Sequence, residues 1–272
     1  MSAATNAAGE VLGFHCLYRD NLNLEGYYGM YLIVDQVFRR QGLGKILYNH
    51  LLSEADEMGA KTLRTRVRDD CDEGIRFASH RGFVQKKHSI EMRLDLQTWD
   101  DKRYNGILEA LQAEGFRFTN MDELGDTKDA RRRLFALNNG AAATDPGSDG
   151  IPPWATLEEF EQDVCNSRWY RPDGQIIAID TNNDAWAAMS AITVFEGADH
   201  AYNLFTGTDL RYRGRKLAQA VKTLALRKAR TFGVEAVRTS HNSENVAMIA
   251  IDSKLGYMRT PGTLVMLKEL RD

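Results

Sequence analysis

The feature that most constrains the fold is a sequence pattern that occurs twice with a constant spacing. The segment VFRRQGLGKILYNHLL (37–52) has a later counterpart, LRYRGRKLAQAVKTLAL (210–226), which places Arg213 174 residues after Arg39. An aromatic residue follows each arginine after the same 44 residues: Phe83 in RGF and Tyr257 in LGY. This equal spacing indicates an internal duplication, and therefore two units of similar fold.

Hydrophobic periodicity predicts the same order of strands and helices in both halves. The expected strands are 9–18, 27–34 (buried on both faces), 62–68, 90–96, 116–121, 174–180, 185–195, 201–208, 236–241 and 264–270. The expected helices are 43–58, 73–80, 102–114, 127–139, 156–166, 217–232 and 244–255, with a capping box formed by Thr156 and Glu159. A polar turn is expected at 19–26 and a mobile loop at 140–154, bordering a substrate pocket. The pattern predicts an α/β protein with mixed central sheets flanked by helices.

Composition narrows the class of protein. A net charge of −3 argues against nucleic-acid or anionic-membrane partners, and KDARRRL (128–134) is best interpreted as one charged helix face. The three cysteines are widely spaced and odd in number, which favours reduced thiols and neither a disulfide framework nor a metal site. The sequence has no apolar run of membrane-spanning length and no signal-peptide pattern at its start, so a cytoplasmic protein is expected.

The repeated segment has the chemistry of an anion site. A helix N-terminus offers unpaired N–H groups, glycines allow close approach and positive φ, and Arg39, Arg40 and Gln41 add donors. The spacing Arg-x-x-Gly-x-Gly between a strand and a helix suits a pyrophosphate. It is neither a Walker loop nor a dinucleotide fingerprint. A tight turn without a ligand is the alternative interpretation.

The segments VDQVFRRQGLGKIL, RGF, TDLRYRGRKLAQAVK, TSHNSEN and KLGY resemble the acetyl-CoA-binding segments of the GNAT acyltransferase superfamily. The whole chain resembles the tandem arrangement found in mycothiol synthase. The resemblance implies two consecutive GNAT folds, an N-terminal domain at 1–97 and a C-terminal domain at 98–272. Only 38 residues precede Arg39, so the first fold is expected to be shortened at its N-terminus and to lack its first strand and both acceptor-side helices.

By the same resemblance, the loop amides hold the pyrophosphate of acetyl-CoA, and the preceding strand splays from its neighbour to admit the pantetheine arm. The implied cofactor-binding residues of the first half are Ile33, Val34, Arg39, Arg40, Gln41, Gly42, Leu43, Gly44 and Lys45. Those of the second half are Thr208, Arg213, Gly214, Arg215, Lys216, Ala218 and Asn245, the last being alternatively a helix N-cap. Lys216 stands where Gly42 stands in the first half, so acetyl-CoA is expected to bind more tightly in the first half.

The residues that would carry out proton transfer have a weaker signal in the sequence than the anion-binding turns. The tyrosine that this family uses as an acid corresponds to Ala78 and Asp252, so neither half carries it. The candidate catalytic residues are Glu196, Tyr202 and Asp252. The alternative for Glu196 is a solvated turn residue, and for Tyr202 a core residue. The alternative for Asp252 is a helix-capping or solvated residue. His241 has either a pocket role or a strand-end role. The expected activity is acetyl transfer from acetyl-CoA to a primary amine of a small molecule or peptide, by a monomer or homodimer. The alternative is a non-catalytic acyl-CoA-binding scaffold.

Overall fold

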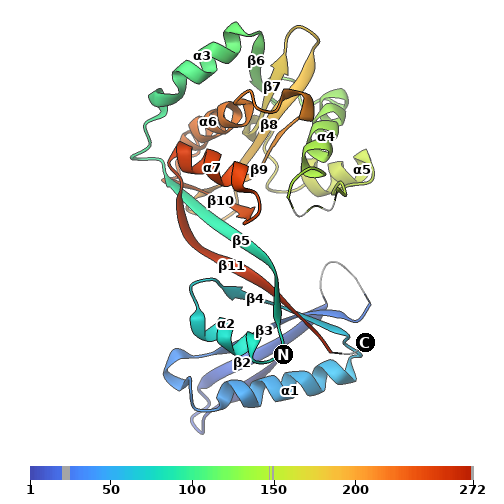
Figure 1. Ribbon diagram of the computed structural model, residues 1–272, viewed down its shortest axis with the longest axis vertical. Helices are drawn as coiled ribbons and strands as arrows, with labels where there is room; N and C mark the ends of the chain where they lie inside the picture. Colours follow the sequence, from blue (N-terminus) through green and yellow to red (C-terminus); the bar gives the residue numbers. More distant parts are fainter. Residues whose placement is uncertain (20–24, 147, 149, 271–272) are drawn as a thin grey trace. The chain divides into compact units, whose positions relative to one another are not determined.

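The computed structural model describes residues 1–19, 25–146, 148 and 150–270. It contains two compact units, which Figure 1 shows as ribbons. Unit 1 comprises Met1–Ser89 and Pro261–Asp272, and unit 2 comprises Ile90–Thr260. The end of the chain therefore belongs to the same unit as its beginning. The domain boundary between residues 97 and 98 stays a prediction from the sequence.

Unit 1 is a sheet in which a long helix connects two neighbouring parallel strands along the chain. Its strands are β1 (Ser2–Thr5), β2 (Val11–Arg19), β3 (Tyr27–Val34), β4 (Thr62–Arg68) and the parts of β11 (Met258–Glu269) and β5 (Val84–Asp95) that lie in this unit, in the order β1-β2-β3-β4-β11-β5. Its helices are the short η1 (Gln36–Phe38), α1 (Leu43–Glu57) and α2 (Asp72–Ser79). β3 pairs with β4 in parallel, and the pairs β1–β2, β2–β3 and β4–β11 are antiparallel.

Unit 2 repeats this arrangement with more elements around it. Its strands follow the order β5, β10 (Ala236–Asn242), β9 (Ala201–Thr208), β8 (Ala185–Val194), β7 (Gln175–Asp180) and β6 (Phe116–Asn120). Its helical segments are η2 (Asp101–Tyr104), α3 (Asn105–Ala113), α4 (Lys128–Ala142), α5 (Leu157–Phe160), the π-helical turn η3 (Glu161–Cys165), η4 (Pro172–Gly174), η5 (Leu210–Tyr212), α6 (Leu217–Arg230) and α7 (Val246–Leu255). β9 and β10 are parallel and are connected through α6.

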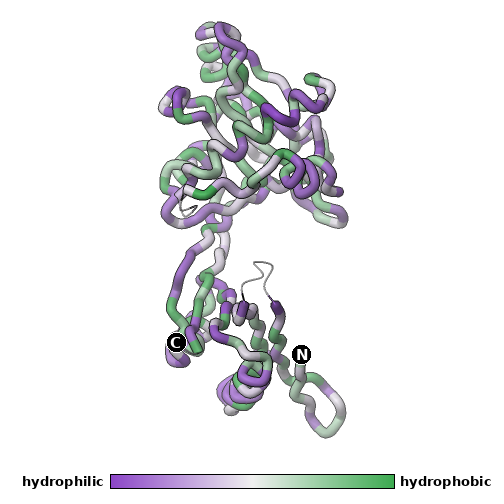
Figure 2. Tube along the Cα trace, turned by 90° about the vertical axis from the view of Figure 1, so that its right-hand side faces the viewer, coloured by the Kyte–Doolittle hydropathy of each residue, from purple (hydrophilic) through white to green (hydrophobic). Residues whose placement is uncertain are grey.

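The hydrophobic cores explain why helices cover both faces of the sheet in unit 2. Along β7, Ile176 and Ala178 face one core with α6, whereas Ile177 and Ile179 face a second core with α4. Successive side chains of a strand point to opposite faces, so a strand without polar alternation is covered on both sides. A third core lies in unit 1 between its sheet and α1. Figure 2 maps the hydrophobic segments on the chain trace.

The structure confirms the tandem α/β architecture and corrects several boundaries. Residues 140–142 of the expected loop belong to α4, and residues 147 and 149 lie outside the described residues, as do 20–24 of the expected polar turn. The strand at Ser2–Thr5 was not expected, and β5 and β11 are longer than predicted. The prediction that 27–34 is buried on both faces is wrong beyond Met30, because Tyr31 and Ile33 are exposed. In the described part of the chain, no helix has the length and apolar character needed to cross a membrane.

Candidate acetyl-CoA site

The turn before α1 is built by local hydrogen bonds. Asp35 directly follows β3 and is the N-cap of η1, where its side chain accepts a hydrogen bond from the amide of Val37. The chain is extended at Arg39, and Gly42 then takes a left-handed conformation (φ 86°) at the N-cap of α1. The turn before α6 has the same construction: Asp209 accepts from the amide of Arg211, and a left-handed residue precedes Leu217.

Each turn has two left-handed positions, and each turn fills one of them with a residue other than glycine. In unit 1 these residues are Arg40 (φ 63°) and Gly42, and in unit 2 they are Gly214 (φ 77°) and Lys216 (φ 65°). A side chain in this conformation costs about 1 kcal/mol relative to glycine. The expectation that Lys216 occupies a positive-φ position is confirmed. The structure nevertheless removes the conformational reason for a stronger site in unit 1, because Arg40 carries the same cost there.

The amides at the start of both helices are free to bind an anion. The first amides of α1 with backbone acceptors are those of Lys45 and Ile46, both bonded to the carbonyl of Gly42. For Leu43 and Gly44, and likewise for Leu217 and Ala218, the described residues offer no acceptor. Such groups carry the partial positive charge of the helix N-terminus.

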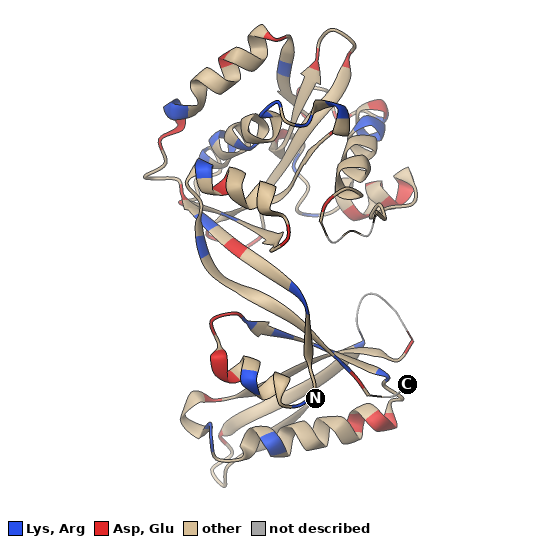
Figure 3. Cartoon of the chain, viewed as in Figure 1, with Lys and Arg blue, Asp and Glu red and all other residues tan. Residues whose placement is uncertain are grey.

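The charge distribution along α1 points in the same direction. Figure 3 shows basic residues at the N-terminal end of this helix and acidic residues toward its C-terminal end. The first turn of α1 has no acidic residue and its last turn has no basic residue. This arrangement opposes the helix dipole, so it does not serve the stability of the helix itself. It leaves the N-terminal end unneutralised, as an anion site requires.

The parallel strands separate beside each turn. In unit 2, β9 and β10 pair only at Ala201–Val237 and Tyr202–Arg238, although β9 continues to Thr208. The register of β9 against β8 shifts at Leu204, a bulge that redirects the backbone at the point of separation. The hydroxyl of Thr239 donates to the carbonyl of Asn203 at 3.0 Å and closes the end of the gap.

Unit 1 has a related separation without a bulge. β3 and β4 pair from Tyr27–Thr62 to Met30–Thr65, while β3 continues to Val34. The hydroxyl of Thr65 donates to the carbonyl of Met30 at 3.3 Å. Thr239, 174 residues later, makes the corresponding bond to Asn203 in unit 2. The part of β3 that is paired with β2 but not with β4 includes the implied cofactor residues Ile33 and Val34. The register between β2 and β3 is regular throughout.

The side chains of the turns differ in their freedom. Arg39 donates to the carbonyl of Val34 at 3.1 Å, and Arg213 donates to the hydroxyl of Thr144. Arg215 is paired with Glu114 at 2.7 Å, so its charge is partly neutralised. Among the described residues, Arg40, Lys45 and Lys216 form no ion pair and are available to an external anion.

Two further implied cofactor residues are explained locally. A Cβ on Gly44 would lie 3.1 Å from the ring of Phe77, so the packing of α1 against α2 also favours a small residue here. Asn245 is the N-cap of α7, with its side-chain oxygen accepting from the amide of Met248 and its amide donating to Asp145. The N-cap interpretation of Asn245 is thus confirmed, and its role toward a cofactor stays a prediction.

The candidate catalytic residues differ in burial and in hydrogen-bond partners. Glu196 is exposed in the turn after β8. Tyr202 is half-buried on β9 at the end of the paired segment, and its hydroxyl donates to Ser240 at 2.9 Å. Burial raises the pKa of Tyr202, while the hydrogen bond to Ser240 opposes that shift.

The interpretation of Asp252 as a helix-capping or solvated residue is wrong. It is completely buried and ion-paired with Lys222 of α6, with 2.7 Å between Nζ and Oδ1. Its second oxygen lies 2.5 Å from Nε2 of His241, at the end of β10. Burial lowers the pKa of Lys222, and the Asp252 carboxylate opposes this shift. The negative charge of the buried Asp252 carboxylate is therefore stabilised by two neighbouring groups that can carry a positive charge.

Sequence reasoning missed Lys222 and Glu91 as members of this region. Lys222 occupies an apolar stripe position of α6, and only its 1% exposure marks it as unusual. Glu91 is half-buried on β5; burial raises its pKa, against the charges of Arg238 and His241. Both positions follow the expected helix and strand periods, so the sequence carries no signal that distinguishes them from solvated residues.

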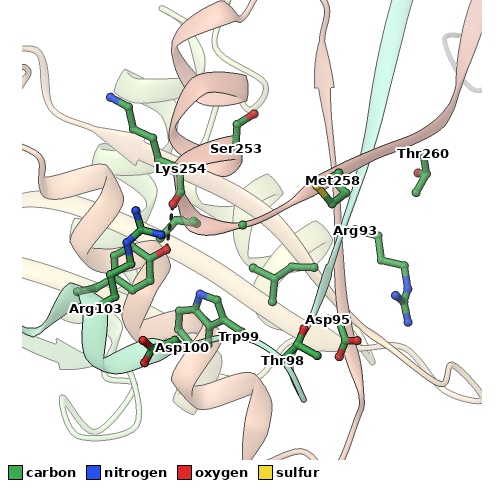
Figure 4. Close-up of a pocket in the computed structure, with 14 residues that line it drawn as sticks. Arg93, Asp95, Thr98, Trp99, Asp100, Arg103, Ser253, Lys254, Met258 and Thr260 are labelled. Atoms are coloured by element: carbon green, nitrogen blue, oxygen red, sulfur yellow. Dashed lines mark hydrogen bonds between the residues drawn. The ribbon is translucent and has the colours of Figure 1, made fainter.

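A separate open pocket of about 480 Å³ lies in unit 2 (Figure 4). Its lining includes Arg93, Trp99, Arg103, Lys254 and Met258, and it contains no residue of either turn. Within it, the hydroxyl of Tyr104 donates to the carbonyl of Lys254 at 2.9 Å. The pocket is therefore not the anion site described above.

Comparison with known proteins agrees with this geometry. Residues 2–83 match the model of the Acetyltransferase (GNAT) family. The family match covers residues 2–83 in unit 1, and the chain as a whole has the fold of tandem GNAT proteins. Members of this family are acetyltransferases. No curated protein matches the sequence.

Solved structures with this fold align along nearly the whole chain. A GCN5-related N-acetyltransferase from Sphaerobacter thermophilus is 16% identical, with a TM-score of 0.72 over 99% of this chain and 80% of the other. A tandem GNAT protein from the clavulanic acid biosynthesis pathway is 18% identical, with a TM-score of 0.64 over 97% and 81%. A GNAT-family acetyltransferase from Colwellia psychrerythraea is 13% identical, with a TM-score of 0.60 over 97% and 84%. At these identities the likeness concerns the fold.

Proposed function

We propose that the chain transfers an acetyl group from acetyl-CoA to a primary amine of a small molecule or peptide, and that unit 2 carries out the reaction. The observation that carries the proposal is the combination, in unit 2, of free amides before α6 with the separation of β9 from β10. A phosphate-binding helix end beside a gap between strands suits a long ligand with an anionic end. Unit 1 has the same two features, but its described residues form neither the bulge nor elements that correspond to β6, α4 and α5.

Proton transfer is assigned from burial and charge. The amine acceptor must lose a proton, and Glu91 is a half-buried carboxylate whose pKa burial raises, which suits a general base. The departing thiolate needs a proton, and His241 lies on β10 two residues beyond Thr239, at the end of the gap. Asp252 accepts from His241 and holds the orientation of its ring, so Asp252 is a positioning residue.

The base assignment is tested with a matched pair of carboxylates. Thiol release from acetyl-CoA is measured with a panel of primary amines for the Glu91→Gln and Glu196→Gln variants. Loss of a general base lowers kcat/KM by roughly 100-fold or more, so Glu91→Gln is expected to show this loss and Glu196→Gln to retain parental activity. Equal effects of the two changes would contradict the assignment of Glu91.

A second candidate, a non-catalytic acyl-CoA-binding scaffold, is favoured by one observation. Asp252 stands at the family's tyrosine position and is engaged by Lys222 and His241. Calorimetry with acetyl-CoA on the Gly42→Glu and Lys216→Glu variants identifies the binding unit. Binding without thiol release across the amine panel would support the scaffold, whereas absence of binding would refute both candidates.

The proposed environment is a reducing one. Cys16, Cys71 and Cys165 are all free thiols in the structure, which suits the cytoplasm.

A further inference from the structure

Two histidines and a glutamate meet in unit 1, away from the turn before α1. His15 comes from β2, whereas His50 and Glu54 lie one helical turn apart on α1. His15 is completely buried, and the other two side chains are 59% and 26% exposed. One ligand atom from each residue can be chosen so that all three atoms lie within 4.8 Å of one another.

The interatomic distances suit a first-row transition metal. Nε2 of His15 lies 3.0 Å from Nδ1 of His50, and that nitrogen lies 3.4 Å from Oε1 of Glu54. Zinc bonds to nitrogen and oxygen are about 2.0–2.2 Å, and a tetrahedron of such bonds separates its ligand atoms by roughly 3.3–3.5 Å. Only a small outward adjustment of the two imidazoles is therefore needed to admit an ion.

The protein's own hydrogen bonds do not complete this cluster. Nδ1 of His15 is buried and has no hydrogen-bond partner among the described residues, and Oε2 of Glu54 lies 3.7 Å away. Because a neutral imidazole has one N–H and one lone pair, an ion at Nε2 of His15 would leave the proton on Nδ1.

The surroundings favour a cation. The cluster lies on the C-terminal half of α1, where the helix dipole is negative and Figure 3 shows acidic residues. The hydroxyl of Ser2 donates to Oε1 of Glu54 at 2.9 Å, and this bond orients the carboxylate as outer partners of metal ligands do. Imidazole and carboxylate together suit zinc and its neighbours in the first transition row.

We propose that His15, His50 and Glu54 form a divalent transition-metal site, with zinc as its probe ion, that ties α1 to β2. The fourth position of a tetrahedral ion is left to water, because these three residues make up the whole described cluster. The ion would stabilise unit 1, whose described residues form fewer helices than those of unit 2. The site is independent of acetyl transfer.

The test uses the full chain after chelator treatment, titrated with zinc chloride by calorimetry and monitored by thermal unfolding. One zinc ion per chain is expected, with a higher melting temperature in its presence. His50→Gln and Glu54→Gln change partly exposed side chains and should weaken zinc binding at least about 10-fold, as loss of a metal-site partner does. His80→Gln, an exposed histidine at the end of α2, is the matched control and should bind as the parent does.

Cobalt(II) provides a second measurement that does not depend on stability. The parent and the His80→Gln variant should show the intense visible absorption of tetrahedral cobalt, and the His50→Gln and Glu54→Gln variants should lose it. Absence of zinc binding, or equal binding by all four proteins, would refute the site. In that case the three residues form a hydrogen-bonded cluster only.

Discussion

The buried ion pair between Lys222 and Asp252 gives the sharpest prediction about stability. Both side chains are almost completely inaccessible to water, and Nζ lies 2.7 Å from the carboxylate. Lys222→Met keeps the length of the side chain but removes its charge. Asp252 is then left in the core with His241 alone. Removing one partner of a buried pair costs about 3–5 kcal/mol, because the remaining carboxylate loses the cation that faces its Oδ1.

The same helix supplies a control of matched chemistry. Lys228 pairs with Asp173 at 2.8 Å, but these side chains are 29% and 28% exposed. Lys228→Met should cost about 1 kcal/mol or less, because solvent screens a partly exposed pair. For a unit of this size, each kcal/mol lowers the melting temperature by about 2–4 °C, so Lys222→Met should lower it by roughly 10 °C.

A double-mutant cycle separates the pair from its surroundings. Urea unfolding is measured for the parent, Lys222→Met, Asp252→Asn and the combined variant. Replacing both charged groups relieves the uncompensated charge, so the combined variant should be more stable than the sum of the single changes by at least about 2 kcal/mol. Additive free energies, or a cost for Lys222→Met no larger than that for Lys228→Met, would refute this account of the core of unit 2.

Two further predictions concern a left-handed backbone in the anion turns and the carboxylate of Asp180 at the end of β7. Gly42→Ala and Gly214→Ala should each destabilise the protein by about 1 kcal/mol, because the added Cβ meets no atom within 4 Å and only the left-handed backbone is penalised. Gly140→Ala, inside α4 with equally open surroundings, should not destabilise it; urea unfolding that ranks all three alike contradicts the left-handed turns. The amide of Asn182, and then the Tyr212 hydroxyl, lower the pKa of Asp180 below its ordinary value of 3.8, so its contribution to stability is complete above that pH and lost as pH falls through the lower native pKa. Asp180→Asn should therefore cost more at pH 6 than at roughly pH 3 in urea unfolding, and an equal cost at both would show that the carboxylate is not stabilised by these donors.

Much of the candidate site follows from local sequence. The turns before α1 and α6 are set by an aspartate cap, a left-handed residue and the start of an amphipathic helix, all within ten consecutive residues. Interactions between near neighbours determine such structures, so they can be read from residue type and spacing. The constant offset of 174 residues then predicts the duplication. The structure shows the same relation at Thr65 and Thr239, whose hydroxyls each donate to a carbonyl of the neighbouring parallel strand.

What the sequence by itself determined is therefore the pair of strand–turn–helix motifs, their periodic helices and strands, and the two-unit α/β class. Only the tertiary structure decided that Asp252 is buried against Lys222, that His15 meets His50 and Glu54, and that β11 returns to unit 1. These arrangements join residues far apart in the chain, and their stability depends on which faces pack together. Periodicity shows that a face is buried, but it does not identify the partner that buries it.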